Sequence, residues 1–347
     1  MRHLRVPSRE TAAWLTKLSN LGWLEQGYSI VNLNTHRGIP LSALAPNKIE
    51  GLEQIEIERE NPRPKHWLEL IPLDIRQTFE DFWPMSHDEL GDILILKIPE
   101  EINHLEQMVA DAILTLNPSI RLVCADEGVK GEYRVRDLRP IKSRNDDFST
   151  RTRVRENGKQ FWIDPAKAYY SPRLATERLN TLVQARELRS RLGRPIRVID
   201  PYAGIGPALP ILFEDGLVEW AHASDINPEA VKLLKENLPE VESAIYNALE
   251  LPSDLHGKAD LLLINLPHSS IDHLEQLLPL LAKGEEVMVR GWAIMANEEV
   301  KNTQKRIVEI FNQCEVLEIE LKKTRSYSPS DAFCVFQISC IIPKVKD

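Results

Sequence analysis

Apolar and polar residues follow two alternating patterns from about residue 166 to residue 347. Short apolar runs such as "IRVIDPY", "ADLLLINLP" and "EEVMVRGW" are typical of buried strands, whereas "PEAVKLLKENL" repeats its apolar residues at helical spacing. Strands and helices that alternate along a chain form a mostly parallel sheet with helices on both faces. The pattern therefore predicts an α/β domain over residues 166–347.

Individual elements of this domain can be predicted from the same pattern. A helix over residues 174–192 leads into the strand "IRVIDPY", which is followed by a glycine turn and a second helix before the strand "EWAHASDI". Further β and α patterns alternate up to two closing strands.

Two smaller units are predicted before this domain. Residues 1–55 combine a helical pattern with the short strand "YSIVNLN", which indicates a small N-terminal domain. The charged, proline-rich "ENPRPKHW" is predicted to be a linker. Residues 60–165 mix strands with one amphipathic helix and are predicted to form an α+β domain, in which "KSRNDDFSTRTRVRENG" is a basic loop.

The net charge of −9 conceals a basic segment. Between Arg134 and Arg197 there are 17 Lys and Arg residues and 7 Asp and Glu residues, a balance of +10 that leaves −19 for the rest of the chain. Such a segment can contact a polyanion, and it can equally be a helix with a solvated arginine face. Charge alone leaves both interpretations open.

Cysteine and histidine spacing predicts no metal site. The four cysteines are scattered, and His268 and His273 have no metal-binding spacing with other ligands. The chain has neither a signal-peptide pattern nor an apolar run long enough to span a membrane. Together with reduced thiols, this indicates a cytoplasmic protein without a membrane partner.

A glycine turn follows the first strand of the α/β domain. Gly204 and Gly206 let the backbone approach a ligand at the carboxyl edge of the sheet, and Asp225 ends the next strand, where a carboxylate can bind a ribose. A dinucleotide fingerprint would need a third glycine where this chain has Leu209, and Pro207 removes an N–H that a pyrophosphate would use. These residues favour S-adenosylmethionine, which has no phosphates.

Several motifs resemble, in order, those of the archaeal and eukaryotic tRNA (guanine-37-N1)-methyltransferases. They are "GDILILKIP", "GEYRVRDL", "RENGKQFWIDPAKAYYSPRLATER", "VIDPYAGIGP", "SDINPEAVKLLKENL", "INLPHSS" and "RSYSPSDAF", and they cover roughly residues 85–340. A sibling family transfers the aminocarboxypropyl group of the same cofactor during wybutosine synthesis. Asn-Leu-Pro after the fourth strand and Pro207 in the glycine turn are more typical of the methyltransferases.

The resemblance implies a class I (Rossmann-like) fold, S-adenosylmethionine as cofactor and a monomer that binds the anticodon stem-loop of tRNA at guanosine 37. It also implies a possible role in tRNA recognition for the N-terminal domain. The residues that it assigns to cofactor binding are Arg173, Asp200, Tyr202, Ala203, Gly204, Gly206, Asp225, Ile226, Asn227, Asn247 and Asn265.

The chemistry of N1-methylation assigns roles to further residues of these motifs. N1 of guanine carries a proton at neutral pH, and negative charge develops on O6 as that proton leaves, so the site needs a base and a cation. By resemblance, Glu177 is the base and Arg136, in preference to Arg134, is the cation. Asn265 and Pro267 are expected to hold the guanine. The residues expected to stack on the base or line its pocket are Tyr169, Tyr170, Ser171, Pro172, Tyr327 and Pro329.

The chain departs from the family pattern at three places. Asn247 stands where an acidic residue usually holds the adenine, "RGW" replaces a tyrosine pair, and the segment before "RENG" is rich in arginine. Asn247 and "RGW" leave open a non-catalytic RNA-binding module. Three enzymatic alternatives also remain: aminocarboxypropyl transfer, methylation of a wybutosine intermediate and, third, a protein-glutamine methyltransferase. The third is disfavoured because those enzymes usually carry Asn-Pro-Pro-Tyr, where this chain has Asn-Leu-Pro-His.

Overall fold

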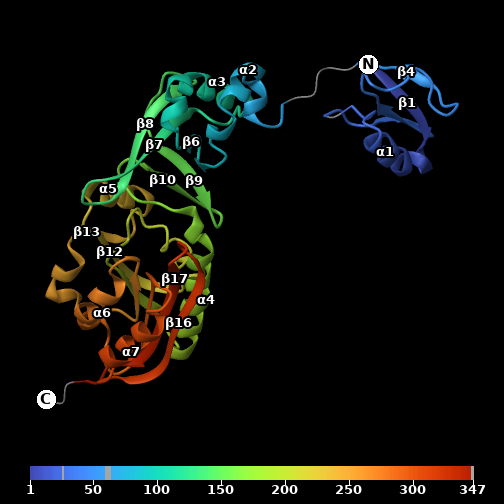
Figure 1. The fold of residues 1–347 in the computed structure, drawn as a ribbon. Coiled ribbons are helices and arrows are strands. Elements are labelled where there is room, and N and C mark those ends of the chain that lie inside the picture. The colour runs from blue at the N-terminus through green and yellow to red at the C-terminus, as the bar shows by residue number, and fades with distance from the viewer. Residues whose placement is uncertain (26, 59–63, 345–347) are drawn as a thin grey trace. The chain divides into compact units, whose positions relative to one another are not determined.

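The computed structural model describes residues 1–25, 27–58 and 64–344 (Figure 1). The chain divides into two compact units, Met1–Pro72 and Leu73–Asp347, and each is described by itself. Part of the predicted linker, residues 60–63, lies outside the described residues.

In the described residues of the first unit, a four-stranded antiparallel sheet packs against one α-helix. The strand order is β2-β3-β1-β4. Leu4 and Val6 of β1 and Leu18 of the helix are completely buried, and their burial supplies the core that holds the helix on the sheet. The elements are β1 (Arg2–Pro7), α1 (Thr11–Asn20), β2 (Val31–Leu33), β3 (His36–Pro40) and β4 (Gln54–Glu56).

The second unit begins with a four-stranded sheet of order β5-β6-β7-β8. All four residues of β6 are buried, as its run of Ile and Leu predicts. The elements are α2 (Leu73–Thr78), β5 (His87–Leu90), β6 (Ile93–Leu96), α3 (Glu106–Leu116), β7 (Leu122–Lys130) and β8 (Val135–Ser143).

The predicted basic loop is wrong in its second half. Residues Thr152–Glu156 form strand β9, which pairs antiparallel with β10 (Lys159–Ile163). Thr152, Val154 and Glu156 are buried and Arg153 and Arg155 are exposed, so the segment alternates with the period of a strand. The arginines concealed this period because only one buried position, Val154, is apolar.

The α/β domain contains a seven-stranded sheet of order β13-β12-β11-β14-β15-β17-β16. The first five strands of this order are parallel, and β17 is antiparallel to both β15 and β16. This arrangement confirms the predicted Rossmann-like fold. The strands are β11 (Ile196–Asp200), β12 (Val218–Asp225), β13 (Glu242–Ile245), β14 (Leu261–Ile264), β15 (Glu286–Ala296), β16 (Glu315–Ser326) and β17 (Asp331–Ile341).

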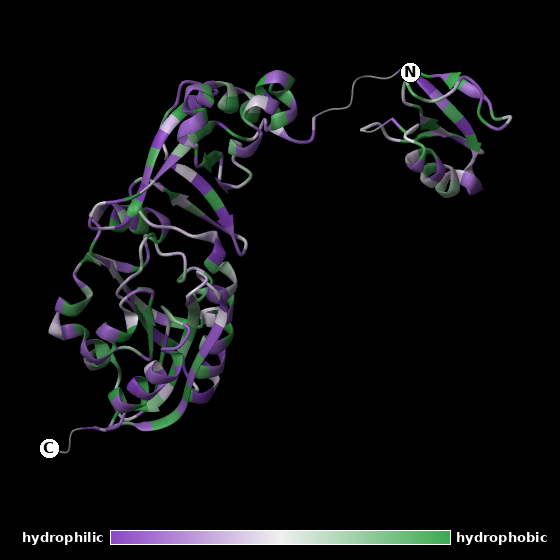
Figure 2. Cartoon of the chain, viewed as in Figure 1, coloured by the Kyte–Doolittle hydropathy of each residue, from purple (hydrophilic) through white to green (hydrophobic). Residues whose placement is uncertain are grey.

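Helices cover both faces of this sheet. Leu261 and Leu263 of β14 pack with residues of α4 and α5, whereas Leu262 and Ile264 pack with residues of α6 and α7. Figure 2 shows apolar residues gathered in the strands between these helices. The helices are α4 (Ala175–Leu192), α5 (Pro228–Asn237), α6 (Ser270–Leu277) and α7 (Val300–Ile310).

The helix predicted after the glycine turn is wrong. Residues 207–213 form successive turns, and a short 3-10 helix at Glu214–Gly216 is the one helical element described between β11 and β12. Pro210 contributes to the difference, because a proline beyond the first position of a helix lacks the N–H that the helix needs, and its ring clashes with the preceding turn. The turn therefore has no helix N-terminus that could bind a pyrophosphate.

The boundary predicted between residues 165 and 166 stays a prediction. In the structure, one hydrophobic cluster includes Ile93 and Phe161 before this position and Tyr170 and Leu233 after it. Among the residues that the structure describes, no helix is long and apolar enough to cross a lipid bilayer.

Candidate active site

Asp225 organises the glycine turn at the carboxyl edge of the sheet. One of its carboxylate oxygens accepts a hydrogen bond from Gly204 N at 2.8 Å, and the other accepts one from Asn227 N at 2.9 Å. Burial raises the pKa of Asp225, and the backbone N–H groups of Asn227, Gly204 and Ile226 oppose this rise. Gly206 has φ +83° and would place a Cβ 2.5 Å from Leu234 of α5, so a side chain is excluded there.

Asp200 lies at the end of β11 beneath the same turn. The side chain is 1% exposed and accepts a hydrogen bond from Tyr202 N at 3.3 Å. Burial raises its pKa to about 7; the Tyr202 hydrogen bond lowers it, and the negative charge of Asp225 raises it further.

This buried carboxyl predicts a specific dependence of stability on pH. The folded chain keeps the proton of Asp200 up to about pH 7, whereas the unfolded chain loses it near pH 4, so ionising Asp200 lowers the free energy of unfolding across this window. Asp200→Asn removes the ionisation. We expect the Tm of the variant minus that of the wild type to increase from pH 4.5 to pH 8 in calorimetric scans. A pH-independent difference would contradict the assignment.

Other residues predicted to bind the cofactor surround the turn. Ile226 is 47% exposed although it is apolar, which suits contact with a flat ring. The Asn247 Oδ1 atom accepts from Leu249 N at 3.2 Å, so its amide N–H groups stay available to a ligand. Asn227 is used within the protein, because it caps α5 and donates to Lys167 O at 2.7 Å.

The two adjacent tyrosines point to different environments, as strand-like alternation predicts. Tyr169 is 57% exposed, whereas Tyr170 is 5% exposed and donates a hydrogen bond to Glu156 at 2.8 Å. Glu156 also pairs with the buried Arg178 at 2.5 Å. Tyr169 can therefore contact a ligand, and Tyr170 belongs to the core.

Asp88 joins two of the predicted site arginines. It pairs with Arg136 at 2.6 Å and with Arg173 at 3.1 Å. Partial burial acts to raise the pKa of Asp88, but the hydrogen bonds and charges of Arg136 and Arg173 outweigh it and the pKa is lowered. Arg134 is exposed in the turn before β8, with φ +50°, and has no such partner among the described residues.

Glu177 lies in the first turn of α4, with its side chain 14% exposed. Its carboxylate is 3.5 Å from the Arg290 guanidinium and accepts from Asn180 at 3.3 Å. Arg290 is itself held by Thr181 at 3.0 Å and Gln337 at 2.7 Å. Because these groups are mostly buried, the carboxylate has a defined position at the start of the helix.

The corner after β14 is fixed through its backbone. The carbonyl of Pro267 accepts a hydrogen bond from Ile294 N at 2.7 Å. The Asn265 side chain is half-buried and forms no hydrogen bond with any other described residue, so its amide is free to bind a ligand. His268 makes an edge contact with Tyr327, with ring centroids 6.0 Å apart.

Further contacts bring these segments to one edge of the sheet. Arg325, on the strand before Tyr327, donates to the carbonyl of Arg173 at 3.2 Å. A Cβ added at Gly204 would lie 3.6 Å from the carbonyl of Tyr169. The glycine turn, residues 169–177, the Asn265 corner and the Tyr327 loop are thus neighbours, although they are far apart in the sequence.

Two residues of this arrangement were missed at the level of sequence. Asp88 gives no signal, because an acidic residue in a short polar segment such as "SHDEL" is ordinarily solvated. Arg290 does give one, since it interrupts the apolar strand of the "RGW" segment. Trp292 of the same segment packs on Leu174, directly before α4, so this departure from the family pattern supports the helix that carries Glu177.

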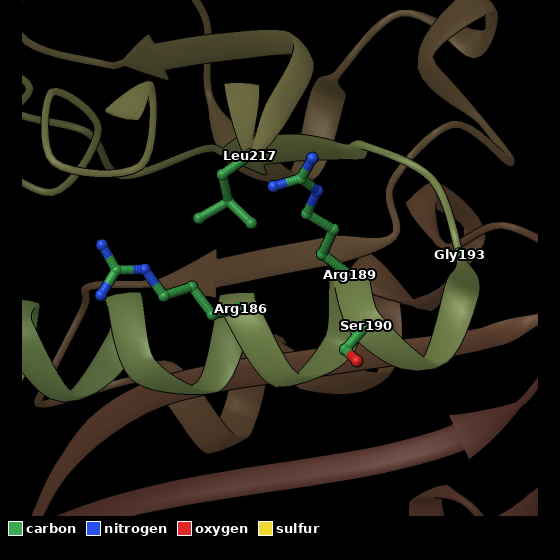
Figure 3. A pocket seen from close by; sticks show the side chains of 5 residues that line it. All are labelled: Arg186, Arg189, Ser190, Gly193 and Leu217. Carbon is green, nitrogen blue, oxygen red and sulfur yellow. The ribbon is translucent and has the colours of Figure 1, made fainter. Parts of the chain in front are cut away.

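A separate hollow of about 420 Å³ lies at the opposite edge of the sheet (Figure 3). Gly193 follows α4 and Leu217 precedes β12, which places the hollow at the amino ends of the strands. The residues that line it are Arg186, Arg189, Ser190, Gly193 and Leu217. None of the predicted site residues is among them.

The strand order, the glycine turn after β11 and the acidic end of β12 define a class I methyltransferase domain. Residues 152–320 match the TRM5/TYW2 methyltransferase domain, and residues 69–142 match the TYW2 N-terminal domain. The chain is 31% identical over 295 residues to the tRNA (guanine(37)-N(1))-methyltransferase Trm5b of Pyrococcus abyssi, covering 83% of each chain. The chain belongs to the TRM5/TYW2 methyltransferase family, which confirms the predicted resemblance.

Other relatives agree with this assignment. The Trm5b of Methanocaldococcus jannaschii is 26% identical over 320 residues, which is 89% of each chain. The crystal structure of Trm5b from P. abyssi matches with a TM-score of 0.70 at 28% identity, covering 99% of this chain and 100% of that one. TYW2 of P. horikoshii in complex with MeSAdo shares the fold, with a TM-score of 0.58 at 18% identity over 77% of this chain and 98% of that one.

Proposed function

We propose that the chain transfers a methyl group from S-adenosylmethionine to N1 of guanosine 37 in the anticodon loop of tRNA. One observation carries the proposal: the segments that contain Glu177, Arg136 and Asn265 lie close together. They lie beside the glycine turn that Asp225 holds through hydrogen bonds. The names of the two Trm5b relatives described above support the same substrate and position.

Residues around the glycine turn fit the cofactor. Among the described residues, no side chain lies within 4 Å of a Cβ built at Gly204, so a ligand can approach the backbone there. Ile226 offers an exposed apolar surface, and Asn247 retains amide donors for the adenine. Asp225 is positioned at the strand end where a ribose binds in such sheets. When bound, S-adenosylmethionine supplies an electrophilic methyl group on a sulfonium.

Three side chains act on the guanine. The Glu177 carboxylate accepts the proton from N1, and Arg136 stabilises the charge on O6 with N–H groups that Asp88 does not use. The free Asn265 amide can donate to and accept from the base edge, and the rigid Pro267 corner presents it. Tyr169 and Tyr327 are exposed, which leaves their rings free to stack on a base that has left the anticodon loop.

The match of residues 69–142 to a TYW2 N-terminal domain favours a second candidate function. The sibling enzymes transfer the aminocarboxypropyl group of the same cofactor, and a cofactor site of this design could serve either transfer. Asn-Leu-Pro at residues 265–267 and Pro207 favour the methyl group. The monomeric and cytoplasmic state stays a prediction, and all residues assigned here lie within one unit of a single chain.

The decisive experiment is to incubate the purified chain with a guanosine-37 tRNA transcript and S-adenosylmethionine labelled in the methyl group. Digestion and mass spectrometry of the nucleosides are expected to give 1-methylguanosine. The same transcript with adenosine at position 37 should remain unlabelled. A heavier adduct on guanosine 37 would instead establish aminocarboxypropyl transfer, and the absence of any modified nucleoside would refute both functions.

A further inference from the structure

The exposed face of the β9–β10 pair concentrates positive charge. Arg151, Arg153 and Arg155 occupy alternate positions and are exposed, and Trp162 of β10 lies directly opposite Arg153. We call these four residues the arginine face. The opposite face of the same strands is buried in the core, so the arginine face cannot turn inward.

Trp162 orders two of these arginines. The guanidinium carbon of Arg153 lies 4.2 Å from the Trp162 ring centroid, and that of Arg151 lies 4.4 Å from it. A guanidinium that packs on an aromatic ring keeps its N–H groups at the ring's edge available to an acceptor. Because the ring already restricts the side chain, little conformational entropy remains to be lost on binding. The ring already packs against two cations, which favours a role in holding arginines over stacking with a nucleobase.

The charges of this face are largely uncompensated. Arg151 pairs with Glu236 of α5, but neither Arg153 nor Arg155 forms an ion pair with any other residue that the structure describes. By contrast, most other arginines near the site pair with carboxylates, as Arg136, Arg173 and Arg178 do. Arg153, which is ordered by Trp162 and unpaired, and the unpaired Arg155 two residues on together offer two guanidinium groups to an anion with several oxygen atoms.

The arginine face continues toward the candidate active site. Glu156, next to Arg155, binds Tyr170 and Arg178, and Asn157 in the turn after β9 donates to the carbonyl of Ala175 in α4 at 3.4 Å. A strand advances about 3.3 Å per residue, so the arginines form a row that ends beside the segment carrying Tyr169 and Glu177.

We propose that the arginine face binds successive phosphates of the RNA backbone and so holds the RNA while its base enters the site. This rests on the proposed function for the identity of the RNA. The contact is to phosphates and is therefore independent of base sequence, unlike the contacts of Asn265. Such contacts release counterions, which makes their contribution depend steeply on salt.

The test compares the wild type with the double variant Arg153→Gln/Arg155→Gln. The probe is a fluorescent RNA hairpin with the sequence of an anticodon stem-loop containing guanosine 37, titrated by anisotropy at 50 to 300 mM KCl. We expect binding about tenfold weaker at low salt, and a slope of log K against log[salt] that is smaller by about 2. Cofactor binding, measured by calorimetry, should be unchanged.

Two further variants keep the test specific. Arg153→Lys/Arg155→Lys retains the charge and is expected to recover most of the salt slope. Lys301→Gln/Lys305→Gln removes two exposed charges from α7 and should leave the slope unchanged. Equal slopes for the glutamine variant and the wild type would overturn the proposal, and so would displacement by poly-glutamate as effective as by unlabelled RNA, which would indicate an acidic protein partner.

The outcome separates this proposal from the proposed function. If the wild type methylates guanosine 37 and the glutamine variant keeps the wild-type slope and KM, the arginine face is refuted and the function stands. If the slope falls as expected but no modified nucleoside forms, the RNA contact is supported and the reaction is refuted.

Discussion

Glu177→Gln is expected to slow methyl transfer by about 10²- to 10⁴-fold, the range typical of a lost general base. Glutamine has nearly the same shape but cannot accept the N1 proton, so the base is removed while the packing around it stays. Arg290 and Asn180 hold the carboxylate, and the Glu177 side chain is 14% exposed. Bulk water therefore cannot easily take over as the base in the variant. Single-turnover assays with labelled cofactor and a guanosine-37 transcript measure the rate.

The same helix offers a matched control for this variant. Glu187 also lies on α4 but is exposed and close to Arg191, at 3.9 Å, so Glu187→Gln should leave turnover within a factor of about two of the wild type. Calorimetry should give the same affinity for S-adenosylmethionine in both variants, because neither residue lies at the glycine turn. Wild-type turnover in Glu177→Gln would remove this residue from the mechanism.

Arg178→Met is expected to lower the free energy of unfolding by about 3–5 kcal/mol, which is the usual effect of breaking a buried ion pair. Arg178 and Glu156 are 2% and 5% exposed at their side chains, and two hydrogen bonds of 2.5 Å join them. Methionine occupies a similar volume, so the main loss is electrostatic: the carboxylate of Glu156 remains buried without its cation. Urea denaturation followed by circular dichroism measures the change.

A second substitution separates charge from packing in this experiment. Glu156→Gln in the Arg178→Met background removes the isolated carboxylate and still accepts the hydrogen bond from Tyr170. The double variant should therefore be more stable than Arg178→Met alone. A double variant that is no more stable than Arg178→Met would contradict this account, because the isolated charge of Glu156 would then not be the main loss, and it would favour a packing role for Arg178.

The α/β fold of residues 166–347 could be predicted because the central strands of its sheet are apolar on both faces. "LLLI" at residues 261–264 is buried at every position, and such an apolar run by itself predicts a central parallel strand. The glycine turn and Asp225 could be placed for a related reason, since parallel strands all end at one edge and their last residues meet there.

Contacts between distant segments could not be predicted in the same way. Asp88 joins Arg136 to Arg173 across 48 and 85 residues of sequence, and no local pattern encodes such a pairing. Strand β9 was missed because polar side chains occupy two of its buried positions. Glu156 forms an ion pair with Arg178, and Thr152 donates a hydrogen bond to Asp92 at 2.7 Å. Hydrophobic periodicity detects buried apolar groups and is insensitive to buried polar groups whose partners lie elsewhere.

The length of β15 has a consequence for the evolution of substrate choice. β14 ends at Ile264, opposite Gly291, but β15 continues from Trp292 to Ala296 against β17, which also pairs with β16, so β15 and the β16–β17 hairpin extend past the end of β14. The loop between β16 and β17, which contains Tyr327, is therefore supported by strands other than β11 and β12, which carry the glycine turn and Asp225. Insertions or deletions in this loop can therefore change which nucleotide enters the site without altering the glycine turn. Relatives with other substrate specificities are expected to differ in this loop first.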